Sequence, residues 1–570
     1  MIPVTRDRWV FVAMVAAVAA CSSDSTAPLA AVCQSTVAPL APAVGAPLFI
    51  DPLTQSSCVE IAASNSSDSA SYLIVAQSAG GDPGDSAPFS LQTGGLAALV
   101  AQGATGRLSQ AAALPHSMWA RLRQRGTVPN TFARGLYERR VAVSQRIRAG
   151  LAPRIQPAAP AMVTKPTLGS QRTFAVCADY FCATFKSVTA TVQSVGAHVV
   201  VYVDNAAPAN GLTATQVDSL RGVFDGLYAI DTTTFGGISD IDTNGVVLTL
   251  MTGVVNSLVS TAQCQAGGYV AGFFLPDDLD TTAAHTNKGE IFYTVVADPS
   301  GTLSCAHAVS DLADVLPTTF LHELEHVIIF NQHVLVRGGP QEDLWLDEAL
   351  ASYAEEVGGR SFLPDSSTFF NYVIGDLYNS YIYLLNPQDH FLLQESDTVL
   401  EDFGAGWLYI RYLMDQFGPS LAARLTQTTL TGTTNVATQT GVPFATTSGR
   451  WSMANWVSDL PGFSAPAVLR YTSWSFRNVY ADFNAFDPAD FPRAFPLVPT
   501  PFVAGGVAAG FAARAQRAGL ALSDYLRAGS GTYTLATQHP GSGGFSILFN
   551  GQNGALSPAL IPQLDIVRLH

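Results

Sequence analysis

The sequence predicts an α+β protein in which strands and helices occupy separate stretches of the chain. Strand-forming runs dominate the central part before residue 300, and helical spacing dominates residues 318–460. Alternating strand patterns also occur near both ends of the chain, which adds small β-rich units to the central α+β region. At 570 residues the chain is long enough for about two to four domains.

The first β-rich unit covers residues 48–93 and is predicted to be a small β-sandwich, with Ser71–Ala76 as its clearest strand. Composition then changes, because Arg121–Arg172 contains eleven lysines and arginines and one acid, Glu138. The first part of this basic segment has helical character, whereas Pro153–Pro166 has the composition of a linker. Three interpretations stay open: a solvated helix with a linker, a prosegment removed by proteolysis, or a contact with anionic lipid head groups.

Three strands are predicted in the central region, at His198–Asp204, Gly245–Met251 and Glu290–Val296. A helix is predicted over Thr213–Tyr228 with a threonine cap, and Gly404–Phe417 is predicted to be an amphipathic helix. This order of strands first and helices later is the reason for the α+β assignment.

A second β module is predicted at the C-terminus, with strands at Gly531–Leu535, Phe545–Phe549 and Leu564–Val567. The sequence therefore divides into five parts. They are a leader at 1–20, a tether with the N-terminal β module at 21–98, the basic segment at 99–172, the central α+β domain at 173–495 and the C-terminal β module at 496–570.

Residues 1–20 have the pattern of a secretory signal, with two arginines before an apolar run at Trp9–Ala20. This run is too short to cross a bilayer core of about 30 Å. Val18–Cys21 resembles a bacterial lipobox, which implies cleavage before Cys21 and lipidation of its thiol, and an ordinary signal peptide is the alternative. By resemblance to Gram-negative lipoproteins, Ser22 rather than aspartate after Cys21 is compatible with the outer membrane. We therefore expect a protein of the bacterial cell envelope, held by a lipid anchor in the membrane, or a secreted one.

The chain has seven cysteines, and assigning Cys21 to the lipid leaves an even number, which suits an oxidising compartment. Proximity in the sequence is the only argument for a particular pairing. It suggests the disulfides Cys33–Cys58, Cys177–Cys182 and Cys264–Cys305.

Composition and charge exclude some classes of protein. Charged residues make up 13% of the chain and hydrophobic residues 48%, which is typical of a globular rather than a disordered protein. The formal net charge of −15 gives no overall attraction to nucleic acid, so no nucleic-acid partner is expected.

The residues with the clearest chemistry are His322–His326, which form an H-E-x-x-H motif. On a helix the two histidines leave one face a turn apart, so both rings can bind one tetrahedral zinc at about 2.0–2.1 Å. Glu323 follows the first ligand and can act as a general base on a water at the metal. Apolar neighbours predict a buried helix, with Pro317 near its start.

A third ligand is available in Trp345–Tyr353, a second helical pattern that follows the motif. Glu348 can lie beside the two histidines, because a helix, a loop and another helix provide this geometry. Three protein ligands leave one zinc position open, which is typical of a catalytic site. Asp347 either orients one of the histidines from behind or caps the second helix.

Together, H-E-x-x-H and W-L-x-E-x-x-A-x-Y resemble the gluzincin metallopeptidases. Trp345–Glu355 is similar to the corresponding segment of the membrane alanyl aminopeptidases, but no G-x-M-E-N exopeptidase motif is present in the sequence. A closer resemblance, over roughly residues 195–420, is to the hyicolysin family of secreted bacterial zinc peptidases. It includes Asp240–Gly245, Gly267–Phe274 and Phe330–Asn331.

The resemblance implies a zincin-like domain with a mixed-sheet lobe and a helical lobe. It also implies zinc on His322, His326 and Glu348, with Glu323 as the general base of peptide hydrolysis. One predicted strand is then expected to be an edge strand that pairs with an extended substrate. Spacing does not assign the residue that stabilises the oxyanion. The candidates downstream are Tyr353, Tyr372, Tyr378, Tyr381, Tyr383 and His390.

Asp240–Gly245 also matches the opening of a calcium loop, D-x-D-x-N-G, with Asp240, Asp242 and Asn244 as ligands. Position twelve of the loop is Met251 instead of a bidentate glutamate, which excludes a full EF-hand. A tight turn between strands is therefore favoured over a calcium site.

The leading hypothesis is an exported, membrane-anchored zinc endopeptidase that acts on protein or peptide substrates. The alternatives are a zinc hydrolase of other amides and a non-catalytic cell-surface binding module that keeps the same fold. The binding module is disfavoured because Glu323, both histidines and Glu348 are all present.

Overall fold

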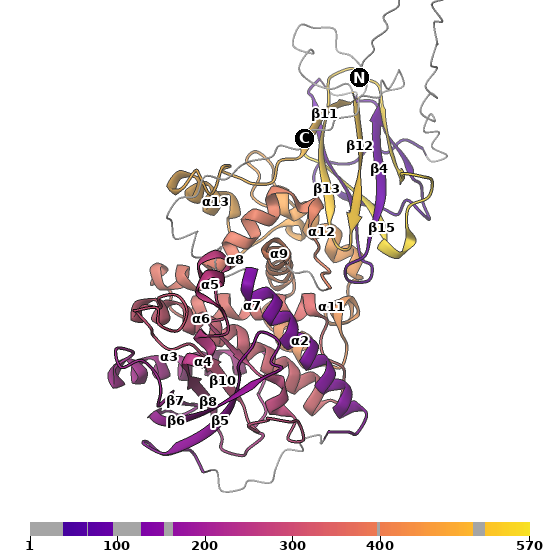
Figure 1. Ribbon diagram of the computed structural model, residues 1–570. Helices are drawn as coiled ribbons and strands as arrows, with labels where there is room; N and C mark the ends of the chain where they lie inside the picture. Colours follow the sequence, from indigo (N-terminus) through magenta and orange to yellow (C-terminus); the bar gives the residue numbers. More distant parts are fainter. Residues whose placement is uncertain (1–37, 65–66, 95–126, 153–163, 396–398, 505–518) are drawn as a thin grey trace, which may run out of the picture.

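The computed structural model describes residues 38–64, 67–94, 127–152, 164–395, 399–504 and 519–570 (Figure 1). This part of the chain is mixed α and β, in agreement with the predicted α+β class. A six-stranded sheet and most of the helices form one region, and a five-stranded and a four-stranded sheet form another.

Strands from near the two ends of the chain combine into one β-sandwich. The sheet orders are β1-β15-β3-β13-β11 and β12-β4-β14-β2. The strands are β1 (Pro47–Ile50), β2 (Cys58–Ile61), β3 (Ala70–Ser78), β4 (Ser86–Gly94), β11 (Thr500–Ala504), β12 (Gly519–Arg527), β13 (Gly531–Gln538), β14 (Phe545–Gly551) and β15 (Pro562–Arg568). Phe545 packs against Tyr72 and Phe502 of the opposite sheet, with ring centroids 5.8 and 6.2 Å apart.

The structure therefore differs from the prediction of separate β modules at 21–98 and 496–570. β3 lies between β13 and β15, and β4 lies between β12 and β14. In Figure 1 the indigo strand β4 runs beside the yellow strand β12. Alternating hydrophobicity identifies a strand and its buried face, but it does not specify a pairing partner more than four hundred residues away.

The central sheet has the strand order β5-β6-β7-β8-β10-β9. Its strands are β5 (Gln171–Cys177), β6 (Phe185–Val195), β7 (Val199–Asp204), β8 (Val247–Met251), β9 (Gly272–Phe274) and β10 (Ile291–Thr294). β7, β8 and β10 are parallel to one another, whereas β9 is antiparallel to β10 and forms an edge. The three strands predicted between residues 198 and 296 correspond to β7, β8 and β10. All three are interior strands, so the expectation that one of them is an edge strand was wrong.

Two long helices, α3 (Ala214–Thr234) and α6 (Val309–Phe330), pack against this sheet. Phe224 of α3, Phe292 of β10 and Phe320 of α6 meet with ring centroids 4.5 to 6.0 Å apart. The Thr213 side chain caps α3 as predicted. α6 begins earlier than predicted, and Pro317 lies inside it, because buried Leu312 and Leu316 continue its apolar face towards the N-terminus.

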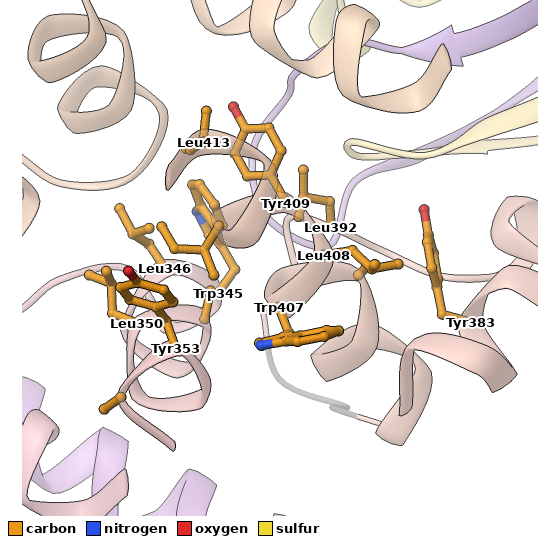
Figure 2. Close-up of a cluster of buried hydrophobic side chains, with 14 of the residues drawn as sticks. Trp345, Leu346, Leu350, Tyr353, Tyr383, Leu392, Trp407, Leu408, Tyr409 and Leu413 are labelled. Atoms are coloured by element: carbon orange, nitrogen blue, oxygen red, sulfur yellow. The ribbon is translucent and has the colours of Figure 1, made fainter. Parts of the chain in front are cut away.

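The remaining helices follow the sheet and form the helical part of the central region. They are α7 (Leu344–Arg360), α8 (Ser366–Leu385), α9 (Leu400–Phe417), α10 (Leu421–Thr426), α11 (Gly432–Thr440), α12 (Phe444–Val457) and α13 (Phe476–Phe486), with the shorter α4 (Gly253–Asn256) and α5 (Thr261–Gly267) earlier in the chain. A π-helical turn, Asn331–Val336, extends α6, and 3-10 turns occur at Pro276–Leu279, Pro387–Asp389, Ala467–Leu469 and Pro558–Leu560. Figure 2 shows the aromatic core between α7 and α9, with Trp345, Tyr353, Trp407 and Tyr409.

The helical part of the basic segment, α2 (Thr127–Arg148), packs on the central region (Figure 1). Arg139 pairs with Asp277 at 2.7 Å and Arg146 with Asp280 at 3.0 Å. Its neighbour Arg140 is buried. One face of α2 is therefore in contact with protein instead of solvent, while the prosegment and lipid-contact interpretations stay predictions.

Two of the predicted disulfides are confirmed, Cys177–Cys182 and Cys264–Cys305. Cys58 is also disulfide-bonded, and its predicted partner Cys33 lies outside the described residues, as does Cys21. Within the described ranges, no helix combines the length and the apolar character needed to cross a membrane.

Candidate metal centre

The three predicted metal ligands lie together in the structure. α6 presents His322 and His326 one turn apart with ring centroids 4.9 Å apart, and α7 presents Glu348 opposite them. The two Nε2 atoms are 3.3 and 3.7 Å from the Glu348 carboxylate oxygens, and the three ligand atoms lie within 4.8 Å of one another. Ligands of a tetrahedral zinc are about 3.3 Å apart when each bond is about 2.0–2.1 Å. The donor set and its spacing therefore fit zinc.

The close packing of α7 against α6 brings Glu348 to this position. Leu346 and Leu350 leave the side of α7 opposite Glu348 and are buried in the cluster of Figure 2, so Glu348 faces α6. Further along α7, Gly358 lies against Leu321 of α6, and a Cβ at this position would collide with that leucine. The absence of a side chain thus allows the two helices to approach closely.

A carboxylate lies beside the second ring nitrogen of each histidine. His322 Nδ1 is 2.9 Å from Glu355 Oε1, and His326 Nδ1 is 3.2 Å from Asp347 Oδ1. A carboxylate beside Nδ1 favours the tautomer in which Nδ1 carries the proton. Nε2 then keeps its lone pair, which is the state that binds a metal. Asp347 therefore lies where it orients His326, and the residue at the helix cap is Asp343.

Glu325, His326 and Asp347 form a second buried group of potential ligand atoms. This group uses the Nδ1 side of His326, which faces Asp347. A metal at that position would compete for the same ring nitrogen that the carboxylate orients, so the group is better described as support for the first site.

Sequence reasoning did not identify Arg140 or the role of Glu355. Arg140 Nη2 of α2 is 2.8 Å from Asp347 Oδ2, and both side chains are buried. Burial raises the pKa of Asp347, but His326 and Arg140 favour the carboxylate and bring the pKa below its ordinary value. Glu355 lies two helical turns after Glu348, so its spacing could have placed it on the face of the ligands. No spacing rule could have found Arg140.

A pocket of about 230 Å³ opens beside the three ligands. Glu323 lines it next to His322, as required of a general base, and burial raises the pKa of its carboxyl group against the opposing effect of the two histidines. Its walls come from α2, the approach to β9, and helices α6, α7, α8 and α9. The lining includes Phe132, Leu136, Glu323, Glu348, Ser352, Glu355, Asp376, Leu400 and Phe403.

The oxyanion candidates named from the sequence do not line this pocket. Tyr353 lies under Arg411, and Tyr383 is in the cluster of Figure 2. Tyr381 donates to the Arg493 carbonyl at 2.9 Å, and Tyr372, Tyr378 and His390 are also absent from the lining of the pocket. Among the described residues, the tyrosine of the lining is Tyr269, which precedes the edge strand β9.

Asp240, Asp242 and Asn244 form a hydrogen-bonded turn away from this pocket. Asp240 accepts from the Gly245 amide, Asp242 accepts from the Asn244 side chain, and Asn244 accepts from the Val246 amide. Glu290 joins the two aspartates in a group of close carboxylates. The contacts agree with the favoured turn, and calcium at this position stays a prediction.

No protein-family model matches the chain, and no curated protein sequence matches it either. The resemblance to the gluzincins and to the hyicolysin family therefore stays a prediction based on the two metal-binding blocks.

Proposed function

We propose that the chain is a zinc-dependent peptidase of the gluzincin kind, exported and anchored to the cell envelope by a lipid on Cys21. One observation carries this proposal. His322, His326 and Glu348 converge at one point, each histidine has a carboxylate on its other ring nitrogen, and Glu323 lines the adjoining pocket.

When bound at this position, zinc supplies a Lewis acid and lowers the pKa of a water towards about 7. Glu323 takes the proton from the attacking water and later delivers it to the leaving amine. Glu355 and Asp347 hold the two imidazoles in the tautomer that leaves Nε2 free, and Arg140 keeps Asp347 charged.

The edge strand β9 supports a peptide as the substrate. It forms the border of the six-stranded sheet, and Ala271 and Gly272 at its start line the pocket. An extended peptide can add to such an edge through main-chain hydrogen bonds, which places its backbone beside the metal site. A mixed sheet, an antiparallel edge strand and the H-E-x-x-H helix together favour a zincin-like domain.

The two confirmed disulfides support an oxidising compartment, as an exported protein requires. Hydrolysis of other amides remains the second candidate, because the same donors and base serve that reaction.

The test is zinc content and casein hydrolysis by the purified full chain, compared with Glu323→Gln and Glu348→Ala. We expect one zinc per chain and hydrolysis that a chelator abolishes. Glu323→Gln should keep zinc and lose about 10²–10⁴-fold in rate, because the general base is removed. Glu348→Ala should weaken zinc binding.

Glu138→Gln is the matched control, because Glu138 is exposed on α2, and it should behave as the parent chain. Zinc binding without hydrolysis of any protein would redirect the proposal to other amides. A chain that binds no zinc would contradict it.

A further inference from the structure

Asp376 of α8 lines the same pocket and has no role in the proposed chemistry. Its side chain is only 5% exposed, and its Oδ2 atom accepts no hydrogen bond from the described residues. The Ser352 hydroxyl hydrogen-bonds to the carboxyl group, so the free atom is Oδ2 alone. Buried polar atoms almost always have a partner in the folded protein. A buried oxygen without a partner, on a residue that lines the pocket, therefore indicates a place for a ligand group that donates hydrogen bonds.

The neighbouring carboxylates of α7 have hydrogen-bond or ion-pair partners, whereas Oδ2 of Asp376 has none among the described residues. Glu355 faces His322 Nδ1 at 2.9 Å. Glu356, on the other side of α7, is held by Arg360 at 2.6 Å and by Arg411 at 3.2 Å. Burial and the nearby carboxylates of Glu355 and Glu356 raise the pKa of Asp376, so a cation at its free Oδ2 would favour the charged form of this side chain.

The pocket as a whole is acidic. Four carboxylates line it, those of Glu323, Glu348, Glu355 and Asp376, and no lysine or arginine occurs among its described lining residues. A divalent metal would balance only part of this charge. The field in the pocket therefore favours a positively charged ligand.

The apolar walls suit the same kind of ligand. Phe132 and Leu136 of α2 face the pocket together with Leu400 and Phe403 of α9. Long basic side chains place their methylene stems on apolar surface and direct the charged end to a polar group. A Cβ at Gly375, next to Asp376, would meet no atom within 4 Å, so there is free space beside the carboxylate.

We propose that Asp376 is the specificity-determining residue of this site and binds an ammonium or guanidinium group of the substrate next to the bond that is cleaved. The inference rests on the proposed peptidase function. The cation is either a lysine or arginine side chain or the free amino terminus of a peptide.

The test uses the zinc-loaded full chain and peptides with blocked ends that differ at one position, which holds lysine, arginine, norleucine or glutamate. The variable position is moved along the peptide, and cleavage sites are located by mass spectrometry. One further norleucine peptide has a free amino terminus, which separates the two sources of the cation. We expect kcat/KM for the cationic peptide to exceed that for blocked norleucine by about 10–100-fold, the usual effect of a hydrogen bond to a charged group.

Asp376→Asn keeps the shape of the side chain and removes its charge, so it should bring this ratio close to one. Asp482→Asn is the matched control, because Asp482 is exposed on α13, and it should keep the ratio of the parent chain. An equal preference in the parent chain, or a preference that survives in Asp376→Asn, would overturn the proposal. The comparison among peptides in the parent chain decides the question even when Asp376→Asn does not fold.

A measurement of peptide binding tests the cation site independently of the proposed hydrolysis. Fluorescence anisotropy of labelled lysine and norleucine peptides on Glu323→Gln needs no turnover. Tighter binding of the lysine peptide that disappears in the Glu323→Gln, Asp376→Asn double variant would support the cation site even when the parent chain hydrolyses nothing. Two binding results would count against the cation site: equal binding of the two peptides, or no binding of either. Either result, combined with no cationic preference in hydrolysis, would reject the cation site.

Discussion

At the scale of single residues, the proposed metal site includes groups that would not bind the metal themselves. His322 and His326 have two ring nitrogens each, and a carboxylate beside each Nδ1, from Glu355 and Asp347, favours the tautomer in which Nε2 is free. Both orienting residues belong to α7, the helix that also supplies Glu348. A shift of this helix would therefore disturb the third ligand and both orienting contacts together.

Glu355→Ala removes the partner of His322 Nδ1, so the ring loses its fixed tautomer and orientation. We expect zinc affinity to fall by about 10–100-fold, the usual effect of losing such a partner. Competition with a fluorescent zinc chelator measures this affinity. Glu138→Ala on the exposed face of α2 should leave it unchanged. An unaltered affinity in Glu355→Ala would show that the contact does not orient the ligand.

At the scale of elements, α2 connects the basic segment to the metal site. Arg140 reaches Asp347, which in turn faces His326, and Phe132 and Leu136 of the same helix line the pocket. The basic composition of this segment left three interpretations open: a solvated helix with a linker, a cleaved prosegment or a contact with lipid head groups. Arg140, however, is buried and forms an ion pair with Asp347. Its burial shows that α2 is part of the structure that supports the site.

Arg140→Met leaves Asp347 as a buried charge without its cation. Removal of one partner from a buried ion pair costs about 3–5 kcal/mol. The urea midpoint of the metal-free chain should fall accordingly, and zinc affinity should fall with it. Arg134→Met is the control on the same helix, because Arg134 is 42% exposed in an ion pair with Glu138, and it should change stability by less than about 1 kcal/mol. Equal effects of the two substitutions would contradict the role of Arg140.

At the scale of the whole molecule, the two ends of the chain form one β-sandwich that rests on α12. Tyr533 of β13 donates to the Ser452 carbonyl of α12 at 3.0 Å, and the Ser452 hydroxyl donates to Gln77 of β3. Gln77 in turn donates to Asp565 of β15 at 2.7 Å. One buried hydrogen-bonded network therefore joins the early strands, the late strands and the helical part of the central region.

A chain that ends at residue 499 tests this unity. It would lack β11–β15, so β3 and β4 would each lose both of their neighbouring strands. Because strands with unpaired edges and an uncovered apolar face are unstable, we expect residues 47–94 to become sensitive to protease and the chain to aggregate. Limited proteolysis with mass spectrometry measures the protease sensitivity of residues 47–94. A resistant 47–94 segment in the shortened chain would show that the early strands form an independent module.

The sequence by itself determined the local features of this protein. The three-residue interval in H-E-x-x-H placed His322 and His326 on one face, because a helix converts spacing into a shared face without reference to the rest of the chain. The helical pattern around Glu348 made it a candidate third ligand, and the packing of α7 against α6 brings it beside the histidines. The positions of several strands followed from alternating hydrophobicity. Two disulfides followed from pairing cysteines that are neighbours in the sequence.

Only the tertiary structure decided which distant groups meet. The ion pair between Arg140 and Asp347 joins residues more than two hundred positions apart, and β4 and β12 are more than four hundred apart. The unpartnered Oδ2 of Asp376 likewise became visible only once the described residues around it had been placed. Such contacts depend on which helices and strands pack together, and this packing is set by the complementary shapes and charges of whole surfaces, which no local pattern encodes.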